Sequence, residues 1–217
     1  IICSTSEVYG NVKKMYMPIK ETQQIAPINP YAVTKVFQDL MSQVYEKSFG
    51  MNVIITRMFS YMNARRNNLF QTAFANQIAG IEQGKLKYLR HGNLKSKRTI
   101  IDTNDAMEAY WLAAKKGKVG EIYNICGKQQ VSVNDFLRKL ISFSNKKIIC
   151  KVDKDLVRPK DIDLQISLAK WGKLKSFAHC IYLGECKTDE STKLPSISAL
   201  VLFKIFKDYL CKCITFR

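Results

Sequence analysis

The sequence predicts an α/β fold with parallel strands, and three observations support this prediction. Strand-like and helix-like segments alternate from the first residue to about residue 170. The strand-like segments are short, continuous apolar runs, which are typical of strands buried on both faces of a sheet. Hydrophobic residues make up 47% of the 217 residues and charged residues 24%, an ordinary globular composition that argues against disorder over the whole length.

The chain opens on a short apolar run, Ile1 to Cys3, with no helix or turn before it. We read this run as a buried strand entered part-way, so we expect the chain to be a fragment that starts inside a domain. A polar loop with three prolines follows over 10–30. Apolar spacing then predicts a helix over 31–49, ended by Gly50. The apolar stripe of this helix contains Val33, Phe37, Leu40, Met41 and Val44.

The next two segments repeat the alternation. β-Branched residues fill 52–59 (NVIITRMF) and predict a buried strand. A second helix is predicted over 70–83, because apolar residues recur there at helical spacing and Gly84 follows. These apolar residues are Phe70, Phe74, Ile78 and Ile81.

Shorter elements complete the pattern. In order, they are strands over 86–90 and 98–101, a helix over about 105–116 with an Asp/Thr cap, a strand over 121–126, a helix opened by Ser132, and a strand over 147–152. The alternation fades after this point. We therefore expect residues 1–172 to form the folded region and residues 173–217 an irregular tail of uncertain origin.

Charge and cysteine content restrict the partners and the compartment. Thirty-five Lys and Arg against 18 Asp and Glu give a net charge of +17, which favours an anionic partner, either a nucleic acid or a small phosphorylated ligand. The sequence contains neither a bilayer-length apolar run nor signal-peptide features, so no membrane partner is predicted. Seven cysteines without metal spacing indicate free thiols in the cytoplasm, and two histidines are too few for a multi-histidine metal site.

Two motifs bring together groups suited to proton transfer. The first is STSEVYG (4–10), directly after the opening strand, and the second is YAVTK (31–35), at the start of the first helix. Tyr31 and Lys35 are four residues apart and share one helical face. A phenol has a pKa of about 10, and a neighbouring ammonium favours the phenolate, which can take a proton from an alcohol. Thr5 could bind the same oxygen, and Glu7 lies at a strand end, where open α/β sheets bind ligands.

These two motifs resemble the extended short-chain dehydrogenase/reductases that modify nucleotide sugars, the NAD-dependent epimerase/dehydratase family. Within that family the sequence is most similar to the GDP-mannose 4,6-dehydratases, because Ser6-Glu7 stands where the TDP-glucose enzymes have Asp-Glu. The resemblance runs from residue 1 to about residue 171. Supporting segments are Arg65-Arg66, Gly92-Asn93-Leu94 before Arg98, GEIYNI (120–125), and Arg158-Pro159.

The resemblance implies a partial Rossmann-like, doubly wound parallel sheet with a smaller substrate-binding α/β region within 1–172. It implies an NADP-dependent dehydratase, with NAD as an alternative cofactor, that converts GDP-mannose to GDP-4-dehydro-6-deoxy-mannose. The catalytic residues would be Thr5, Glu7, Tyr31 and Lys35. Tyr31, Lys35 and Arg66 would bind the cofactor, and Ser6, Arg98 and Arg158 the substrate. The family also suggests a homo-oligomer.

Two departures from the family pattern affect the expected contacts with substrate and cofactor rather than the catalytic residues. Phe59-Ser60-Tyr61 stands where the family has Phe-Asn-His, and no glycine-rich dinucleotide fingerprint occurs in the chain. We therefore expect the 217 residues to be inactive alone. Two alternative enzymes are a GDP-4-dehydro-6-deoxymannose reductase and a nucleotide-sugar epimerase. Two alternatives from other classes are a non-catalytic pseudoenzyme and a basic nucleic-acid-binding protein. The sequence contains no known nucleic-acid-binding motif, which disfavours the last alternative.

Overall fold

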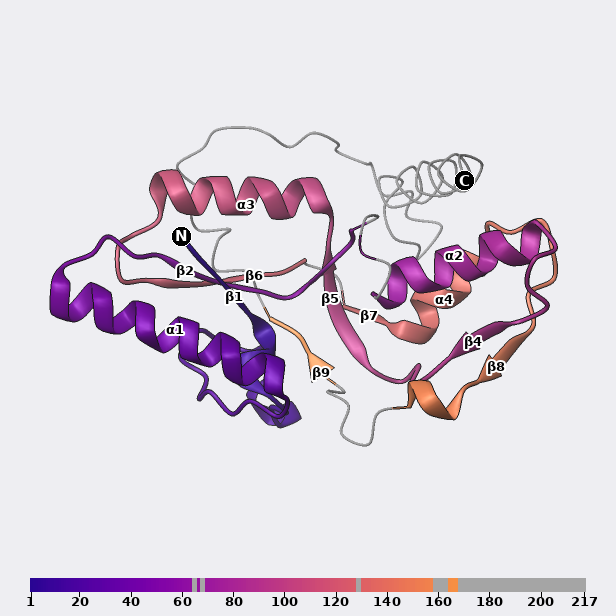
Figure 1. The fold of residues 1–217 in the computed structure, drawn as a ribbon, viewed down its shortest axis with the longest axis horizontal. Helices are drawn as coiled ribbons and strands as arrows, with labels where there is room; N and C mark the ends of the chain where they lie inside the picture. The colour runs from indigo at the N-terminus through magenta and orange to yellow at the C-terminus, as the bar shows by residue number, and fades with distance from the viewer. Residues whose placement is uncertain (64–65, 67–68, 128–129, 158–163, 168–217) are drawn as a thin grey trace. The chain divides into compact units, whose positions relative to one another are not determined.

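A computed structural model describes residues 1–63, 66, 69–127, 130–157 and 164–167, and confirms the predicted α/β class (Figure 1). The chain divides into two compact units. The first unit contains Ile1–Met62 and Asn93–Val133 together with residues 164–167, and the second contains Asn63–Gly92 and Asn134–Val157. The predicted tail, 173–217, lies outside the described residues.

A three-stranded parallel sheet forms the centre of the first unit. Its strands are β1 (Ile2–Thr5), β2 (Ile55–Met58) and β6 (Ile122–Ile125), in the order β1-β2-β6. Helices α1 (Pro30–Phe49) and α3 (Thr103–Lys116) lie on opposite faces of this sheet, which is the doubly wound arrangement that the sequence predicts (Figure 1). Strands β2 and β6 are shorter than the predicted 52–59 and 121–126, whereas β1 extends beyond the predicted 1–3 to Thr5.

The alternation of side chains along β2 explains the two faces. Ile54 and Met58 point to one face, where they pack with the alanines of α3 and with Tyr123 and Ile125. Arg57 points to the other face, toward α1, and is almost fully buried. A period of two is intrinsic to an extended strand.

Helix α1 begins one residue before the predicted start and ends at the predicted glycine. The Asn29 side chain accepts a hydrogen bond from the Ala32 backbone N–H at 2.7 Å, and Pro30 occupies the first helical position, where its missing N–H costs nothing. Gly50, with φ +63°, ends the helix in the left-handed conformation.

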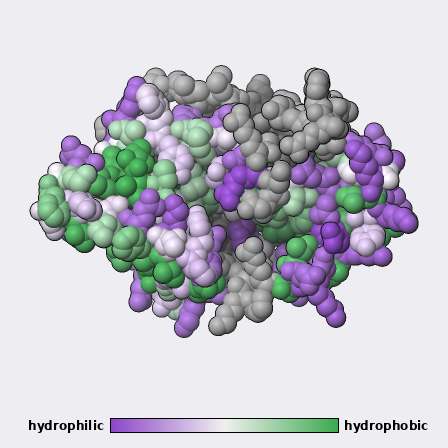
Figure 2. Space-filling model, in the orientation of Figure 1, coloured by the Kyte–Doolittle hydropathy of each residue, from purple (hydrophilic) through white to green (hydrophobic). Residues whose placement is uncertain are grey.

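The apolar stripe of α1 is exposed rather than buried. Its five residues are between 40% and 65% exposed, and they are Val33, Phe37, Leu40, Met41 and Val44. The face that α1 turns to the sheet consists instead of Ala32, Asp39 and Ser42. Hydrophobic side chains accordingly gather over α1 on the surface seen in Figure 2.

The first unit also holds a smaller sheet. Strand β5 (Lys97–Ile101) is parallel to β3 (Ser60–Tyr61) and β9 (Leu164–Gln165) and antiparallel to β7 (Gln130–Ser132). A short 3-10 helix, η1 (Ser6–Tyr9), follows β1, and a second one, η2 (Lys14–Tyr16), interrupts the predicted loop over 10–30.

The second unit is a small α/β layer. Helices α2 (Phe70–Glu82) and α4 (Val133–Ile141) accompany the parallel pair β4 (Leu89–His91) and β8 (Cys150–Val152), and η3 (Lys154–Leu156) follows β8. The Phe70 ring meets Phe74 and Phe136 edge-on, with centroids 6.0 Å and 5.5 Å away. This packing confirms the predicted stripe of the second helix.

In the part of the chain that the structure describes, no helix is long and apolar enough to cross a membrane. The cytoplasmic location stays a prediction of the sequence. The same holds for the domain boundary at residue 172, which falls outside the described residues.

Candidate active site

The STSEVYG motif forms the end of β1 and the short helix η1. Thr5 caps η1, and its hydroxyl accepts a hydrogen bond from the Glu7 backbone N–H at 3.4 Å. Thr5 and Ser6 are buried, whereas Glu7 is partly exposed. These residues therefore lie at the carboxyl end of a parallel strand, the edge where open α/β sheets bind ligands.

Asn29 joins this segment to the start of α1. Its amide nitrogen donates to Glu7 Oε2 at 2.8 Å, while its amide oxygen accepts from the Ala32 N–H. Asn29 is not among the site residues that the sequence motifs predict. An Asn-Pro pair directly before a predicted helix is the signal for an N-cap, and it could have identified this residue.

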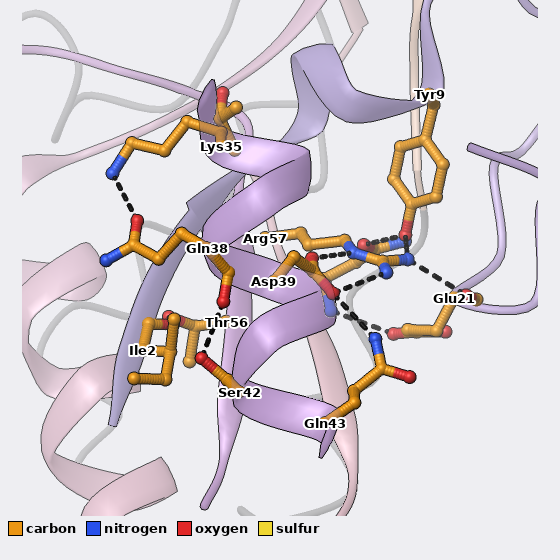
Figure 3. A network of polar contacts seen from close by, with 12 residues as sticks. Ile2, Tyr9, Glu21, Lys35, Gln38, Asp39, Ser42, Gln43, Thr56 and Arg57 are labelled. Atoms are coloured by element: carbon orange, nitrogen blue, oxygen red, sulfur yellow. Dashed lines mark hydrogen bonds and ion pairs between the residues drawn. The ribbon is translucent and has the colours of Figure 1, made fainter. Parts of the chain in front are cut away.

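Tyr31 and Lys35 occupy the first two turns of α1. The Lys35 ammonium donates to the Cys3 carbonyl at 2.9 Å, which anchors it against β1. It also donates to Gln38 Oε1 at 3.0 Å (Figure 3). Tyr31 is 50% exposed, and among the described residues its hydroxyl has no hydrogen-bond partner. An ammonium has three donors, so one N–H of Lys35 stays available to a ligand within this part of the structure.

The structure thus places five of the predicted site residues on two neighbouring segments of the first unit. They are Thr5, Ser6, Glu7, Tyr31 and Lys35. The links between the segments are the hydrogen bond from Asn29 to Glu7 and that from Lys35 to Cys3.

Two other tyrosines of the first unit are poorly suited to accept a proton. Burial raises the pKa of Tyr9 and of Tyr110, because the phenolate loses its hydration. Tyr9 is already occupied, since it donates to Asn124 Oδ1 at 2.7 Å and accepts from Arg57 at 3.0 Å. The exposed Tyr31 is therefore the better candidate for a base that a ligand can reach.

The predicted arginines do not all join this group. Arg98 lies on β5 in the smaller sheet of the first unit, where its guanidinium donates to the Lys97 carbonyl at 3.0 Å. Arg66 is exposed and belongs to the second unit. Arg158 lies outside the described residues. Within those residues there is also no cluster of three His, Cys, Asp or Glu side chains that could hold a metal ion.

The sequence matches the family described as GDP-mannose 4,6 dehydratase over residues 1–170. The chain belongs to this family. The predicted resemblance is therefore confirmed at the level of the family.

Curated relatives share less than a third of their residues with the chain. It is 27% identical over 205 residues to the GDP-mannose 4,6 dehydratase of Dictyostelium discoideum, covering 82% of this chain and 57% of that protein. It is 30% identical over 139 residues to the GDP-6-deoxy-D-mannose reductase of Pseudomonas aeruginosa, covering 63% of this chain and 46% of the relative. The chain thus spans about half the length of the curated relatives it matches.

Solved structures share the fold. The structure of RMD from Pseudomonas aeruginosa complexed with NADPH has a TM-score of 0.72 at 24% identity, covering 80% of this chain and 58% of that one. The UDP-glucose 4-epimerase of Thermus thermophilus in complex with NAD has a TM-score of 0.67 at 21% identity, covering 84% and 58%. One of these two structures contains NADPH and the other NAD. Their similarity to this chain confirms the Rossmann-like fold.

Proposed function

We propose that this chain carries the proton-transfer site of a nucleotide-sugar 4,6-dehydratase that converts GDP-mannose to GDP-4-dehydro-6-deoxy-mannose. The observation that supports this proposal is the placement of Glu7, Tyr31 and Lys35 at the same end of β1. Asn29 links Glu7 to the start of α1, and Lys35 is anchored on Cys3. The Tyr31 phenol and the Glu7 carboxylate provide two separate bases. A C4 oxidation followed by a C5 deprotonation needs one base for each step.

In this proposal the two bases act on adjacent carbons. Tyr31 takes the proton of the C4 hydroxyl, while Thr5 binds the C4 oxygen and Lys35 would hold the cofactor ribose. The ketone at C4 acidifies the C5–H bond, and Glu7 takes this proton. The C6 hydroxyl leaves as water after it receives a proton, which creates a C5=C6 double bond. The hydride taken from C4 would then be returned to C6 and a proton to C5, so the net change is the loss of one water without net redox.

The cofactor would be NADP, with NAD as the alternative, and its nicotinamide supplies the hydride acceptor and donor when bound. The hydroxyl of Tyr31, which has no hydrogen-bond partner among the described residues, and the donor of Lys35 that those residues leave unused fit the ribose end of such a cofactor. Arg66 would contact the cofactor elsewhere, Ser6 would bind the substrate, and Arg98 and Arg158 would bind the nucleotide part of that substrate. No glycine-rich dinucleotide fingerprint occurs in the 217 residues, so the fit concerns only the nicotinamide end.

The test is incubation of the protein, expressed from its complete coding sequence, with GDP-mannose and catalytic NADP. We expect a product lighter by one water, with no net change in NADPH absorbance. The variant Glu7→Gln should keep the exchange of hydride at C4 but lose water elimination, because the amide cannot accept the C5 proton. A wild-type protein that forms no dehydrated product would contradict the proposal.

A reductase is the second candidate, because the chain is 30% identical to a GDP-6-deoxy-D-mannose reductase. Such an enzyme would also use Tyr31 and Lys35 but would not need Glu7 as a C5 base. Stoichiometric consumption of NADPH with a 4-keto-6-deoxy nucleotide sugar, unaffected by Glu7→Gln, would favour the reductase.

We also propose that the protein is a homo-oligomer. The exposed apolar stripe of α1, defined above, supports this proposal, because monomers rarely expose contiguous apolar patches of this kind. The variant Phe37→Lys should lower the mass measured by sedimentation equilibrium, whereas the same substitution at Leu86, which is 43% exposed in the second unit, serves as the control. A wild-type protein that sediments as a monomer would contradict this proposal.

A further inference from the structure

A buried ion pair connects β2 to α1 in the first unit. Arg57 Nε lies 2.8 Å from Asp39 Oδ2, and Arg57 Nη2 donates to Asp39 Oδ1 at 3.1 Å, which is a bidentate geometry (Figure 3). The two side chains are 2% and 0% exposed. Because dehydration of both charges is costly, a buried pair of this kind often stabilises a fold no better than two apolar side chains would. Stability alone therefore does not account for the pair.

The remaining nitrogen of the guanidinium reaches two further segments. Arg57 Nη1 donates to the Tyr9 hydroxyl at 3.0 Å and to the Glu21 carbonyl at 3.1 Å. The Arg57 guanidinium carbon also lies 4.9 Å from the centroid of the Tyr9 ring. Arg57 thus contacts η1, the loop that follows it, and α1 at the same time.

Each of the two proposed catalytic segments contributes one residue to this contact. Asp39 lies one turn beyond Lys35 on α1, and Tyr9 lies two residues beyond Glu7 in η1. The Arg57 side chain therefore ties the helix that carries Tyr31 to the segment that carries the carboxylate. The Asn29 hydrogen bond links the same two segments at their exposed edge.

We propose that Arg57 is a positioning residue, whose simultaneous contacts with Asp39 and Tyr9 set the spacing between Glu7 and the Tyr31 helix. This inference rests on the proposed function. Arg57 does not touch the reacting groups. Its role follows from the fork of the guanidinium, which offers five donors in one plane, whereas a lysine offers a single nitrogen.

The decisive variant removes the pair without leaving a charge buried. In the double variant Arg57→Met/Asp39→Leu both charges are replaced by apolar groups, so the folded state is expected to persist. We expect kcat to fall at least tenfold while KM for the nucleotide sugar changes less than threefold. The Arg57→Lys variant, which keeps the charge but cannot reach all three partners, should show an intermediate kcat.

A control separates positioning from loss of stability. Leu112→Ala removes a side chain of α3, on the opposite face of the sheet, that is 8% exposed. We expect this variant to lower the unfolding midpoint but to keep kcat at a temperature well below that midpoint. Wild-type kcat in the double variant, or an equal loss of kcat in Leu112→Ala, would overturn the inference.

Hydrogen exchange provides a readout that does not depend on the reaction. Backbone amides of Ser6–Tyr9 and of the first turns of α1 should exchange at least tenfold faster in the double variant, while the amides of β6 keep their rates. If the wild-type protein forms no dehydrated sugar, the proposed function fails, yet this comparison still tests the positioning. Unchanged exchange in both segments would refute it.

Discussion

Gly10 limits how the loop between η1 and α1 can pass the candidate site. Its φ is +61°, and a Cβ atom added there would overlap the Ala26 carbonyl oxygen and lie 3.0 Å from the Ala26 carbonyl carbon and 3.3 Å from Ile28 Cγ2. The Ala26 N–H donates to the Val8 carbonyl at 2.9 Å, so a shift of Ala26 breaks a link between the loop and η1. The variant Gly10→Ala should therefore disturb both folding and activity.

The expected loss of stability has two parts. An alanine at φ +61° and ψ −144° lies in a sparsely populated backbone region, which costs about 1–3 kcal/mol, and overpacking against a backbone carbonyl costs about 1–3 kcal/mol. Together they lower the free energy of unfolding by about 2–6 kcal/mol. Gly50→Ala is the control without a steric clash, because Gly50 has φ +63° and ψ 23°, in the αL region, and nothing within 4 Å of an added Cβ. It should lose only the αL cost of about 1–2 kcal/mol.

Urea unfolding followed by circular dichroism measures both variants. We expect Gly10→Ala to be less stable than Gly50→Ala, and the change in unfolded-state entropy to cancel in the comparison because both replace Gly by Ala. The displaced loop also carries Asn29, so Gly10→Ala should lose at least tenfold in dehydratase activity, unlike Gly50→Ala. Equal losses of stability in the two variants would refute the steric argument.

Further predictions concern single side chains. Tyr31→Phe should lower kcat about 100-fold or more with an unchanged unfolding midpoint, since the side chain is 50% exposed, and an active variant would exclude Tyr31 as the base. Burial raises the pKa of the Cys126 thiol to about 12 from the ordinary value of 9.0, so only the unfolded state loses this proton between these values, and stability should fall as pH rises above 9.0. In Cys126→Ala the alkaline loss measured by urea unfolding should be smaller; an identical loss would contradict this cause. Iodoacetamide should label the exposed Cys3 but not the buried Cys126 in the native protein, as peptide mass spectrometry can establish.

The sequence predicts the elements of this fold well because local signals and tertiary packing agree there. Apolar β-branched runs become β2 and β6, and Gly50 ends α1 as expected. The apolar stripe of α1 gives the correct helix but does not reveal its orientation. Periodicity reports that one face is apolar, and it does not say whether that face meets the sheet or remains exposed.

The polar interior was harder to predict. Arg57 stands in the middle of an apolar strand and Asp39 between the apolar positions of α1, and both places are unusual for a charge. Each is ambiguous alone, because a charge in a predicted element most often faces solvent. Only the tertiary structure shows that the two meet. The Tyr31–Lys35 pair was predictable because both residues lie on one helix, where spacing fixes proximity.

The amide of Asn29 serves two partners, and its neighbour protects it chemically. Aspartate in its place would still cap α1, but its carboxylate has no hydrogen to donate to Glu7. Spontaneous deamidation, which would turn this amide into a carboxylate facing another carboxylate, proceeds through attack by the backbone nitrogen of the following residue. That residue is Pro30, whose nitrogen carries no hydrogen. Pro30, the first residue of the helix, thus also protects the hydrogen bond between Asn29 and Glu7 from loss by deamidation.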